Sequence, residues 1–111
     1  MVSEFSYRLT TKAEADLDGI VSYIAVQLEN PQAATGFLNK LQDAIHEACS
    51  FPESGSPVVN EFLPYKDIRK KLVGNYIMYY FPDMNAETIY VLRVIYGRRN
   101  LDEILREINF S

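Results

Sequence analysis

Residues 68–100 are IRKKLVGNYIMYYFPDMNAETIYVLRVIYGRRN, and this stretch decides the fold. It contains three runs rich in Val, Ile, Tyr and Phe, which are typical of strands, at residues 68–73, 76–81 and 88–96. Gly74-Asn75 and residues 82–86 separate the runs and carry turn-forming Gly, Pro, Asp and Asn. The sequence therefore predicts an antiparallel three-stranded meander.

The two-residue loop at Gly74-Asn75 fixes the register of the first hairpin. Val73 is then expected opposite Tyr76, and the alternation of side chains divides the hairpin into two faces. The face expected to be core carries Ile68, Leu72, Ile77, Tyr79 and Phe81. The other face is expected to form an exposed basic and aromatic platform of Arg69, Lys71, Val73, Tyr76, Met78 and Tyr80.

The register of the second hairpin depends on the length of its loop. An even loop over residues 83–86 predicts the pairs Phe81–Thr88, Tyr79–Tyr90, Ile77–Leu92 and Tyr76–Arg93. An odd loop would place Arg93 on the core face, where an unpaired guanidinium costs several kcal/mol. Arg93 is therefore expected on the platform.

The totals predict a single domain over residues 1–111. No apolar run approaches the ~20 residues that cross a bilayer, so no membrane partner is expected. The first residues lack a basic start followed by an apolar block, which argues against a signal peptide. A single cysteine, Cys49, excludes an internal disulfide and suits a reducing cytosol, so a cytoplasmic location is expected.

Charge is unevenly distributed along the chain. The net charge of -4 argues against a protein whose whole surface binds nucleic acid. Residues 66–99 nevertheless carry seven basic and three acidic groups, whereas residues 1–65 carry three basic and nine acidic groups. The predicted sheet is therefore basic and the predicted helices are acidic.

Residues 5–9 alternate apolar and polar side chains, which predicts a short strand that extends the sheet. Capping-box spacing from Thr11 to Glu14 and apolar residues at helical intervals predict a helix over residues 12–29. Asn30-Pro31 provides an N-cap and a proline at the first position of a second helix, whose apolar stripe reaches residue 48. Almost no loop separates the two helices, so they are expected to form an antiparallel hairpin.

Two prolines and a glycine interrupt the chain after the second helix, and a loop is expected to about residue 66. A short helix with an apolar edge is expected to start at Asn100. The predicted fold class is α+β: an N-terminal strand and an α-helical hairpin packed on an antiparallel three- to four-stranded meander, with a short C-terminal helix.

Two groups of residues are candidates for function. The platform, with Arg69, Lys71, Tyr76, Tyr80 and Arg93, suits RNA or an acidic protein surface, because its cations neutralise phosphates and its rings can stack on bases. The alternative is a solvated face whose charges deter edge pairing. Arg98 and Arg99 stand where the C-terminal helix begins, a position that the helix dipole makes unfavourable for cations. That position suggests a function, unless Glu103 or another acid pairs with them.

Other polar groups predict no site. His46 and Cys49 are three residues apart, but a metal needs further ligands and the chain has no second histidine or cysteine. Glu14, Asp16 and Asp18 are interpreted as a solvated acidic face. Neither a metal nor a cofactor is expected.

The order of strand, helical hairpin, FPESGSP loop, IRKKLVGNYIMYYF and YVLRVIYGRRN resembles the RelE/ParE superfamily of toxins from bacterial type II toxin-antitoxin systems. The resemblance covers nearly the whole chain, and LRVIYGRRN is its most specific part. It implies a toxin held inactive by a cognate antitoxin whose C-terminal segment wraps it, in a hetero-oligomer.

The superfamily divides by target, which is ribosome-bound mRNA for RelE-type members and DNA gyrase for ParE-type members. RelE-type members commonly have an arginine at the position of Tyr76 and a tyrosine at that of Leu105, whereas Arg99 and the basic residues 69–71 match them. The candidate catalytic groups are Arg93, Arg99, Tyr76 and Lys71, and the candidates for target or RNA binding are Arg69, Lys71, Tyr80 and Arg98.

RNA cleavage requires a base and an acid. With no histidine near the sheet, Lys71, Tyr76 or Tyr96 would have to transfer the protons, and tyrosine has a pKa of about 10. The sequence therefore favours growth inhibition through gyrase. A ribosome-dependent mRNA endoribonuclease and a non-toxic or degenerate interaction module of the same fold are the alternatives.

Overall fold

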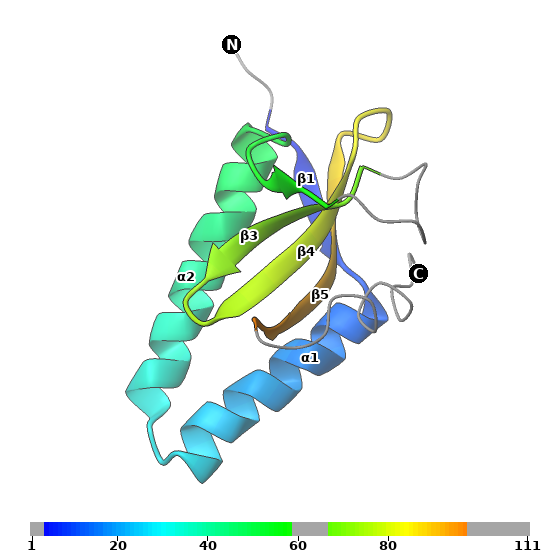
Figure 1. Cartoon of the computed structure of the whole chain (residues 1–111). Coiled ribbons are helices and arrows are strands. Elements are labelled where there is room, and N and C mark those ends of the chain that lie inside the picture. Colours follow the sequence, from blue (N-terminus) through cyan, green and yellow to red (C-terminus); the bar gives the residue numbers. More distant parts are fainter. Residues whose placement is uncertain (1–3, 59–66, 98–111) are drawn as a thin grey trace.

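The computed structural model describes residues 4–58 and 67–97. Its elements are β1 (Ser6–Leu9), α1 (Thr11–Ser22), the π-helix η1 (Tyr23–Gln27), α2 (Pro31–Ser50), β2 (Ser56–Pro57), β3 (Arg69–Val73), β4 (Tyr76–Asp83) and β5 (Thr88–Tyr96). The strands form one sheet in the order β1-β5-β4-β3-β2. β1 is parallel to β5, and the other neighbouring strands are antiparallel. The α+β class and the helical hairpin are confirmed (Figure 1).

The sheet gains a strand at each edge of the predicted meander. β1 pairs with β5 from Ser6 opposite Thr88 to Leu9 opposite Val91, which confirms that the N-terminal strand extends the sheet. β2 lies in the segment expected to be a loop and pairs with Arg69 and Lys70 of β3. The predicted helix after Asn100 lies outside the described residues.

The helix starts follow from their caps. The Asn30 side chain accepts a hydrogen bond from Ala33 N at 3.0 Å, so the predicted cap of α2 is confirmed. α1 is capped by Thr10, whose Oγ1 accepts from Ala13 N, so the predicted capping box at Thr11 is wrong by one residue. The predicted single helix over residues 12–29 ends as the π-turn η1, where Leu28 N donates to Tyr23 O.

The β3–β4 register is confirmed, with Val73 opposite Tyr76, Lys71 opposite Met78 and Arg69 opposite Tyr80. The prediction that Val73, Met78 and Tyr80 lie on an exposed platform is wrong, whereas Ile68 and Tyr79 of the face predicted to be core are buried. Val73, Met78 and Tyr80 are buried in the main core together with residues of α1 and α2, so the helices cover the face predicted to be an exposed platform. On the other face Leu72 is 78% exposed.

The face turned away from the helices has its own apolar cluster. It consists of Ile68, Tyr79, Leu92 and Ile95, with Val58, Ile77, Phe81 and Tyr90 packed against it. Because both faces bury large apolar side chains, alternation along β4 could not identify the face that the helices cover.

The predicted β4–β5 register is wrong. Asp83 lies opposite Thr88, Phe81 opposite Tyr90 and Tyr79 opposite Arg93, so the turn is at residues 84–87. The register shifts between Tyr79 and Tyr80, and Leu92 becomes an extra residue in β5, as in a β-bulge. This irregularity moves Arg93 away from Tyr76, which pairs with Tyr96 instead.

Candidate functional site

Arg93 is buried, with 5% of its surface exposed. Its Nε and Nη2 donate to the two carboxylate oxygens of Asp16 on α1 at 2.7 and 3.0 Å. Asp16 Oδ2 also accepts from the backbone N–H of Val94 at 3.1 Å. The expectations of a platform Arg93 and a solvated Asp16 are therefore both wrong, because α1 brings the carboxylate against β5.

The polar groups of α1 continue the pairing of β5 where β1 ends. Thr10 N donates to Val91 O, and Thr10 Oγ1 donates to Leu92 O, each at 3.0 Å. The carboxylate of Asp16 then accepts from Val94 N. Backbone groups of β5 that have no strand beside them are thus satisfied by the start of α1, as buried polar groups require.

Tyr80 is completely buried and its hydroxyl is occupied. Tyr80 Oη donates to Pro52 O at 2.9 Å and accepts from Gly55 N at 2.8 Å. Burial raises the pKa of Tyr80, although the hydrogen bond from Gly55 lowers it. The hydroxyl holds the loop after α2 against β4.

Arg69 of β3 also forms hydrogen bonds with the loop after α2. Its Nη1 donates to the carbonyl oxygens of Glu53 and Gly55 at 2.8 and 2.9 Å, and its Nε donates to Asp67 at 3.1 Å. Arg69 and Tyr80 therefore both use their polar atoms in hydrogen bonds that stabilise the fold.

Tyr76 lies in an aromatic group under the helical hairpin. Its ring meets Phe37 of α2 edge-on at a centroid distance of 5.1 Å and Tyr96 at 5.8 Å. Burial, and then the neighbouring Tyr23 and Tyr96, raise the pKa of Tyr76. A raised pKa makes this tyrosine a poorer general base near neutral pH.

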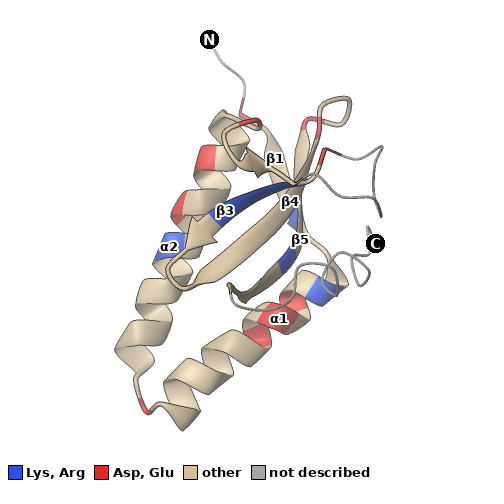
Figure 2. Ribbon diagram, in the orientation of Figure 1, with Lys and Arg blue, Asp and Glu red and all other residues tan. Residues whose placement is uncertain are grey.

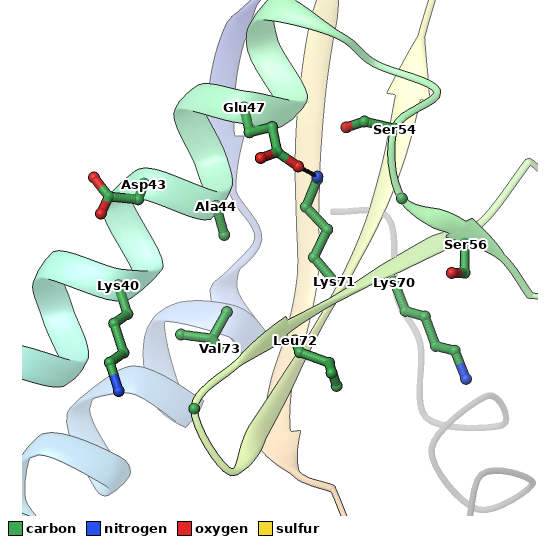
Figure 3. A pocket seen from close by; sticks show the side chains of 12 residues that line it. Lys40, Asp43, Ala44, Glu47, Ser54, Ser56, Lys70, Lys71, Leu72 and Val73 are labelled. Carbon is green, nitrogen blue, oxygen red and sulfur yellow. Dashed lines mark hydrogen bonds and ion pairs between the residues drawn. The ribbon is translucent and has the colours of Figure 1, made fainter.

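A cleft lies between α2 and β3 (Figure 3). Its volume is about 700 Å³, and it is lined by Lys40, Asp43, Ala44, Glu47, Ser54, Gly55, Ser56 and residues 70–74. Lys71 crosses the cleft to form an ion pair with Glu47 of α2. The lining contains three of the four lysines in the described ranges, Lys40, Lys70 and Lys71, together with the carboxylates of Asp43 and Glu47, so its charge is mixed (Figure 2).

The structure therefore separates the predicted site residues. Arg93 and Asp16 lie between α1 and β5, and Tyr76 lies under the helical hairpin. Arg69 and Tyr80 form hydrogen bonds with the loop after α2. Lys71 alone of the described candidates lines the cleft. Arg98 and Arg99 lie outside the described residues, and their roles stay predictions.

Sequence reasoning missed the partners Asp16 and Glu47. A signal existed for Asp16, because it lies at helical spacing between Ala13 and Ile20 on the apolar stripe of α1. Glu47 had no such signal, because its partner Lys71 belongs to a distant strand.

His46 and Cys49 contribute no metal site within residues 4–58 and 67–97, where no cluster of three potential ligands occurs. Cys49 is 4% exposed, and burial, followed by the charge of Glu4, raises the pKa of its thiol. The reactive thiolate is therefore disfavoured.

None of the helices in residues 4–58 and 67–97 combines the length and apolarity that a bilayer-spanning segment requires.

Comparison with known proteins agrees with the fold. Residues 7–101 match the family described as ParE toxin of type II toxin-antitoxin system, parDE. No curated protein sequence matches the chain. The chain belongs to this ParE toxin family, and the predicted membership of the RelE/ParE superfamily is confirmed.

Two solved structures are similar in fold. One is from the chromosomal ParDE TA system of P. aeruginosa, with 20% identity, a TM-score of 0.64, and coverage of 85% of this chain and 97% of that chain. The other is from the toxin-antitoxin complex RelBE2 of Mycobacterium tuberculosis, with 20% identity, a TM-score of 0.62, and coverage of 89% and 98%.

Proposed function

We propose that this toxin acts by binding a protein, DNA gyrase, and not by cleaving mRNA. One observation supports the proposal: the groups that could act as acid, base or phosphate ligand already form ion pairs or hydrogen bonds with other parts of the chain. Arg93 is paired with Asp16, Lys71 with Glu47, and Tyr80 is hydrogen-bonded to the loop. Cleavage of RNA needs accessible groups of this kind.

Each group would have to leave a partner before it could act on RNA. Arg93 is held by a bidentate carboxylate contact, which is among the strong types of hydrogen bond. The hydroxyls of Tyr76 and Tyr80 have raised pKa values, so neither is poised to take a proton at neutral pH. A toxin that works by surface complementarity has no such requirement.

The proposed regulatory partner is a cognate antitoxin. Exposed apolar side chains offer it a surface: Phe51 and Met84 line a hollow of about 430 Å³ together with Phe5 and Pro52. A partner that binds only the folded toxin raises its thermal midpoint by mass action. We expect a higher midpoint for the complex than for the free toxin, and equal midpoints would contradict neutralisation by this route.

Parallel assays on one preparation of purified protein decide the target. We expect inhibition of gyrase supercoiling and no cleavage of ribosome-bound message. Codon-positioned cuts that require ribosomes would instead establish the endoribonuclease. Arg99→Ala remains a useful variant in both assays, because Arg99 is expected to contact either target.

Induction in cells tests toxicity itself. We expect growth to stop when this chain is induced alone and to continue when its neighbouring reading frame is induced with it. Unimpaired growth at confirmed expression would favour the non-toxic interaction module.

A further inference from the structure

The tip of the helical hairpin presents large apolar side chains to solvent. Tyr23 and Val26 of η1, and Leu28 directly after it, each expose between 46% and 69% of their surface. They lie where the chain turns from α1 back into α2 (Figure 1). We call these three residues the tip patch. Contiguous exposed apolar groups are typical of sites that bind a partner.

The backbone of η1 brings the tip patch together. Leu28 N donates to Tyr23 O at 3.0 Å, so the wide π-turn places the leucine one turn from the tyrosine. Glu29 N donates to Val26 O at 3.3 Å, and Glu29 has a φ of 49°, in the left-handed region that glutamate rarely adopts. Short π-helices and strained residues are both frequent at functional sites. The tip therefore has features beyond those needed to join two helices.

Packed rings support the tip patch from the side of the sheet. Tyr23 lies near Tyr76, because its charge is, after burial, the next cause that raises the pKa of Tyr76. The Tyr76 ring meets Tyr96 edge-on at a centroid distance of 5.8 Å, and Tyr96 is exposed at the end of β5. Rings that are already packed lose little freedom on binding, and tyrosine is enriched among the residues that dominate binding energy at interfaces.

The segment around the tip patch is almost without charge. Residues 19–39 contain one charged residue, Glu29, although 23% of the chain is charged. Figure 2 shows the tip of the hairpin almost entirely in tan. No lysine or arginine occurs between Lys12 and Lys40. The cores of protein–protein interfaces are depleted of charge, whereas the phosphates of DNA are bound by Lys and Arg. The tip patch therefore suits an apolar protein surface and not a nucleic acid.

We propose that the toxin inserts the tip patch into an apolar recess of DNA gyrase whose rim carries a cation opposite Glu29. The inference rests on the proposed function and names the surface that performs it. Glu29 is exposed and forms no ion pair with another residue of the described ranges, so it is available to a basic group of the target. A second copy of this chain fits less well, because residues 13–39 of each copy carry acidic groups and no basic one.

The first test compares two tyrosines of nearly equal exposure. Tyr23→Ala removes a ring of the tip patch, whereas Tyr7→Ala removes a ring on β1. Purified gyrase with relaxed plasmid is the probe, and the readout is the toxin concentration that halves supercoiling. We expect Tyr23→Ala to require about tenfold more protein than the parent, and Tyr7→Ala to match the parent. Equal requirements for the two variants overturn the proposal.

The second test changes the sign of the charge at one position. Val26→Glu and Val26→Lys both place a charge in the apolar recess, so each should raise the half-inhibitory concentration about tenfold or more. Glu29→Gln should raise it about twofold to fivefold, because it removes an ion pair at the rim. Parent-like inhibition by Glu29→Gln contradicts the cation at the rim. If Val26→Lys inhibits better than the parent, the tip contacts the phosphates of DNA and the proposal is overturned.

Two other occupants of the tip patch have distinct outcomes. The product of the neighbouring reading frame should bind Tyr23→Ala as it binds the parent. Loss of that binding with parent-like inhibition of gyrase would assign the patch to the antitoxin. Gel filtration should show a monomer, and a dimer that Val26→Glu dissociates would assign the patch to a second copy. Either assignment overturns the proposal.

Hydrogen exchange on the unmodified chain decides the matter if the variants fail to fold. The amides of residues 23–29 should gain protection when gyrase is added, and unchanged exchange there overturns the proposal. A chain that neither binds gyrase nor inhibits it refutes the proposed function itself. Inhibition by the parent without protection at the tip refutes only the tip patch.

Discussion

The carboxylate of Asp16 and the guanidinium of Arg93 meet through two hydrogen bonds of 2.7 and 3.0 Å, although the residues are far apart in the sequence. The contact joins α1 to β5, an interior strand of the sheet, and Asp16 also accepts from Val94 N. A single aspartate thereby fixes both a side chain and the backbone of β5.

Asp16→Ala should destabilise the fold by about 3 kcal/mol or more, because it leaves the buried charge of Arg93 without this partner. Urea unfolding measures the loss. Asp18→Ala, at an exposed position on the same helix, should change stability by only about 0.5 kcal/mol. If the two variants unfold at the same urea concentration, the pair does not stabilise the fold.

Tyr80→Phe should cost about 1–3 kcal/mol, since it leaves the Gly55 N–H without the hydroxyl that accepts from it and the Pro52 carbonyl without its donor. Tyr7→Phe is the control, because Tyr7 is exposed on β1. Thermal or urea unfolding compares the two. A loss for Tyr80→Phe no larger than for Tyr7→Phe would show that water replaces the hydroxyl without cost.

Gly55→Ala should destabilise the chain through a clash. A Cβ at this position would lie 2.5 Å from Tyr80 Oη and 2.9 Å from the carbonyl oxygen of Lys70. Gly19→Ala is the matched control, because a Cβ at Gly19 meets nothing within 4 Å and the residue lies in α1. We expect the control to be neutral or stabilising, as alanine favours helices by up to about 1 kcal/mol over glycine. Equal effects in urea unfolding would contradict the clash.

Stability should fall as the pH rises above about 10. Burial raises the pKa of Tyr76, Tyr79 and Tyr80, so the folded state keeps protons that the unfolded state releases. Their contribution is complete below the unfolded pKa and is lost as the pH passes through the folded values. Urea unfolding between pH 8 and pH 11 should show this decline, and Tyr79→Phe should make it shallower. A slope unchanged in that variant would contradict the prediction.

The Cys49 thiol should react slowly with iodoacetamide while the chain is folded. It is buried and its pKa is raised, and both effects lower the amount of accessible thiolate. Mass spectrometry follows the adduct, and the unfolded chain provides the control because Cys49 is the single cysteine. Equal rates in the folded and unfolded states would show that the α2 end opens readily.

Sequence patterns correctly predicted the features that depend on interactions between residues close in the sequence. The Asn30 cap and the Gly74-Asn75 hairpin depend on residues close in sequence, and both are confirmed. The bulge at Leu92 could not be predicted, because nothing in the alternation of β5 marks an extra residue. The face of the sheet that the helices cover was also beyond the pattern, since β4 is apolar on both sides.

The wrong placement of the candidate site residues followed from the same errors in register and in the covered face. Placing Arg93 beside Tyr76 required a continuous register through Leu92, so one irregularity changed the neighbours of a functional candidate. The partner of Arg93 did carry a sequence signal, because Asp16 is an acid within the apolar stripe of α1.

The parallel pairing of β1 with β5 has a consequence for synthesis. Ser6 of β1 pairs with Thr88 of β5, which is synthesised later. At a translation rate of about 5–20 residues per second, Thr88 is added about 4–16 s after Ser6. During that interval the helical hairpin exists without β5, an interior strand of the sheet that it will cover. The sheet therefore becomes complete only after β5 has been synthesised, and a nascent chain that stops before β5 is a target for proteases.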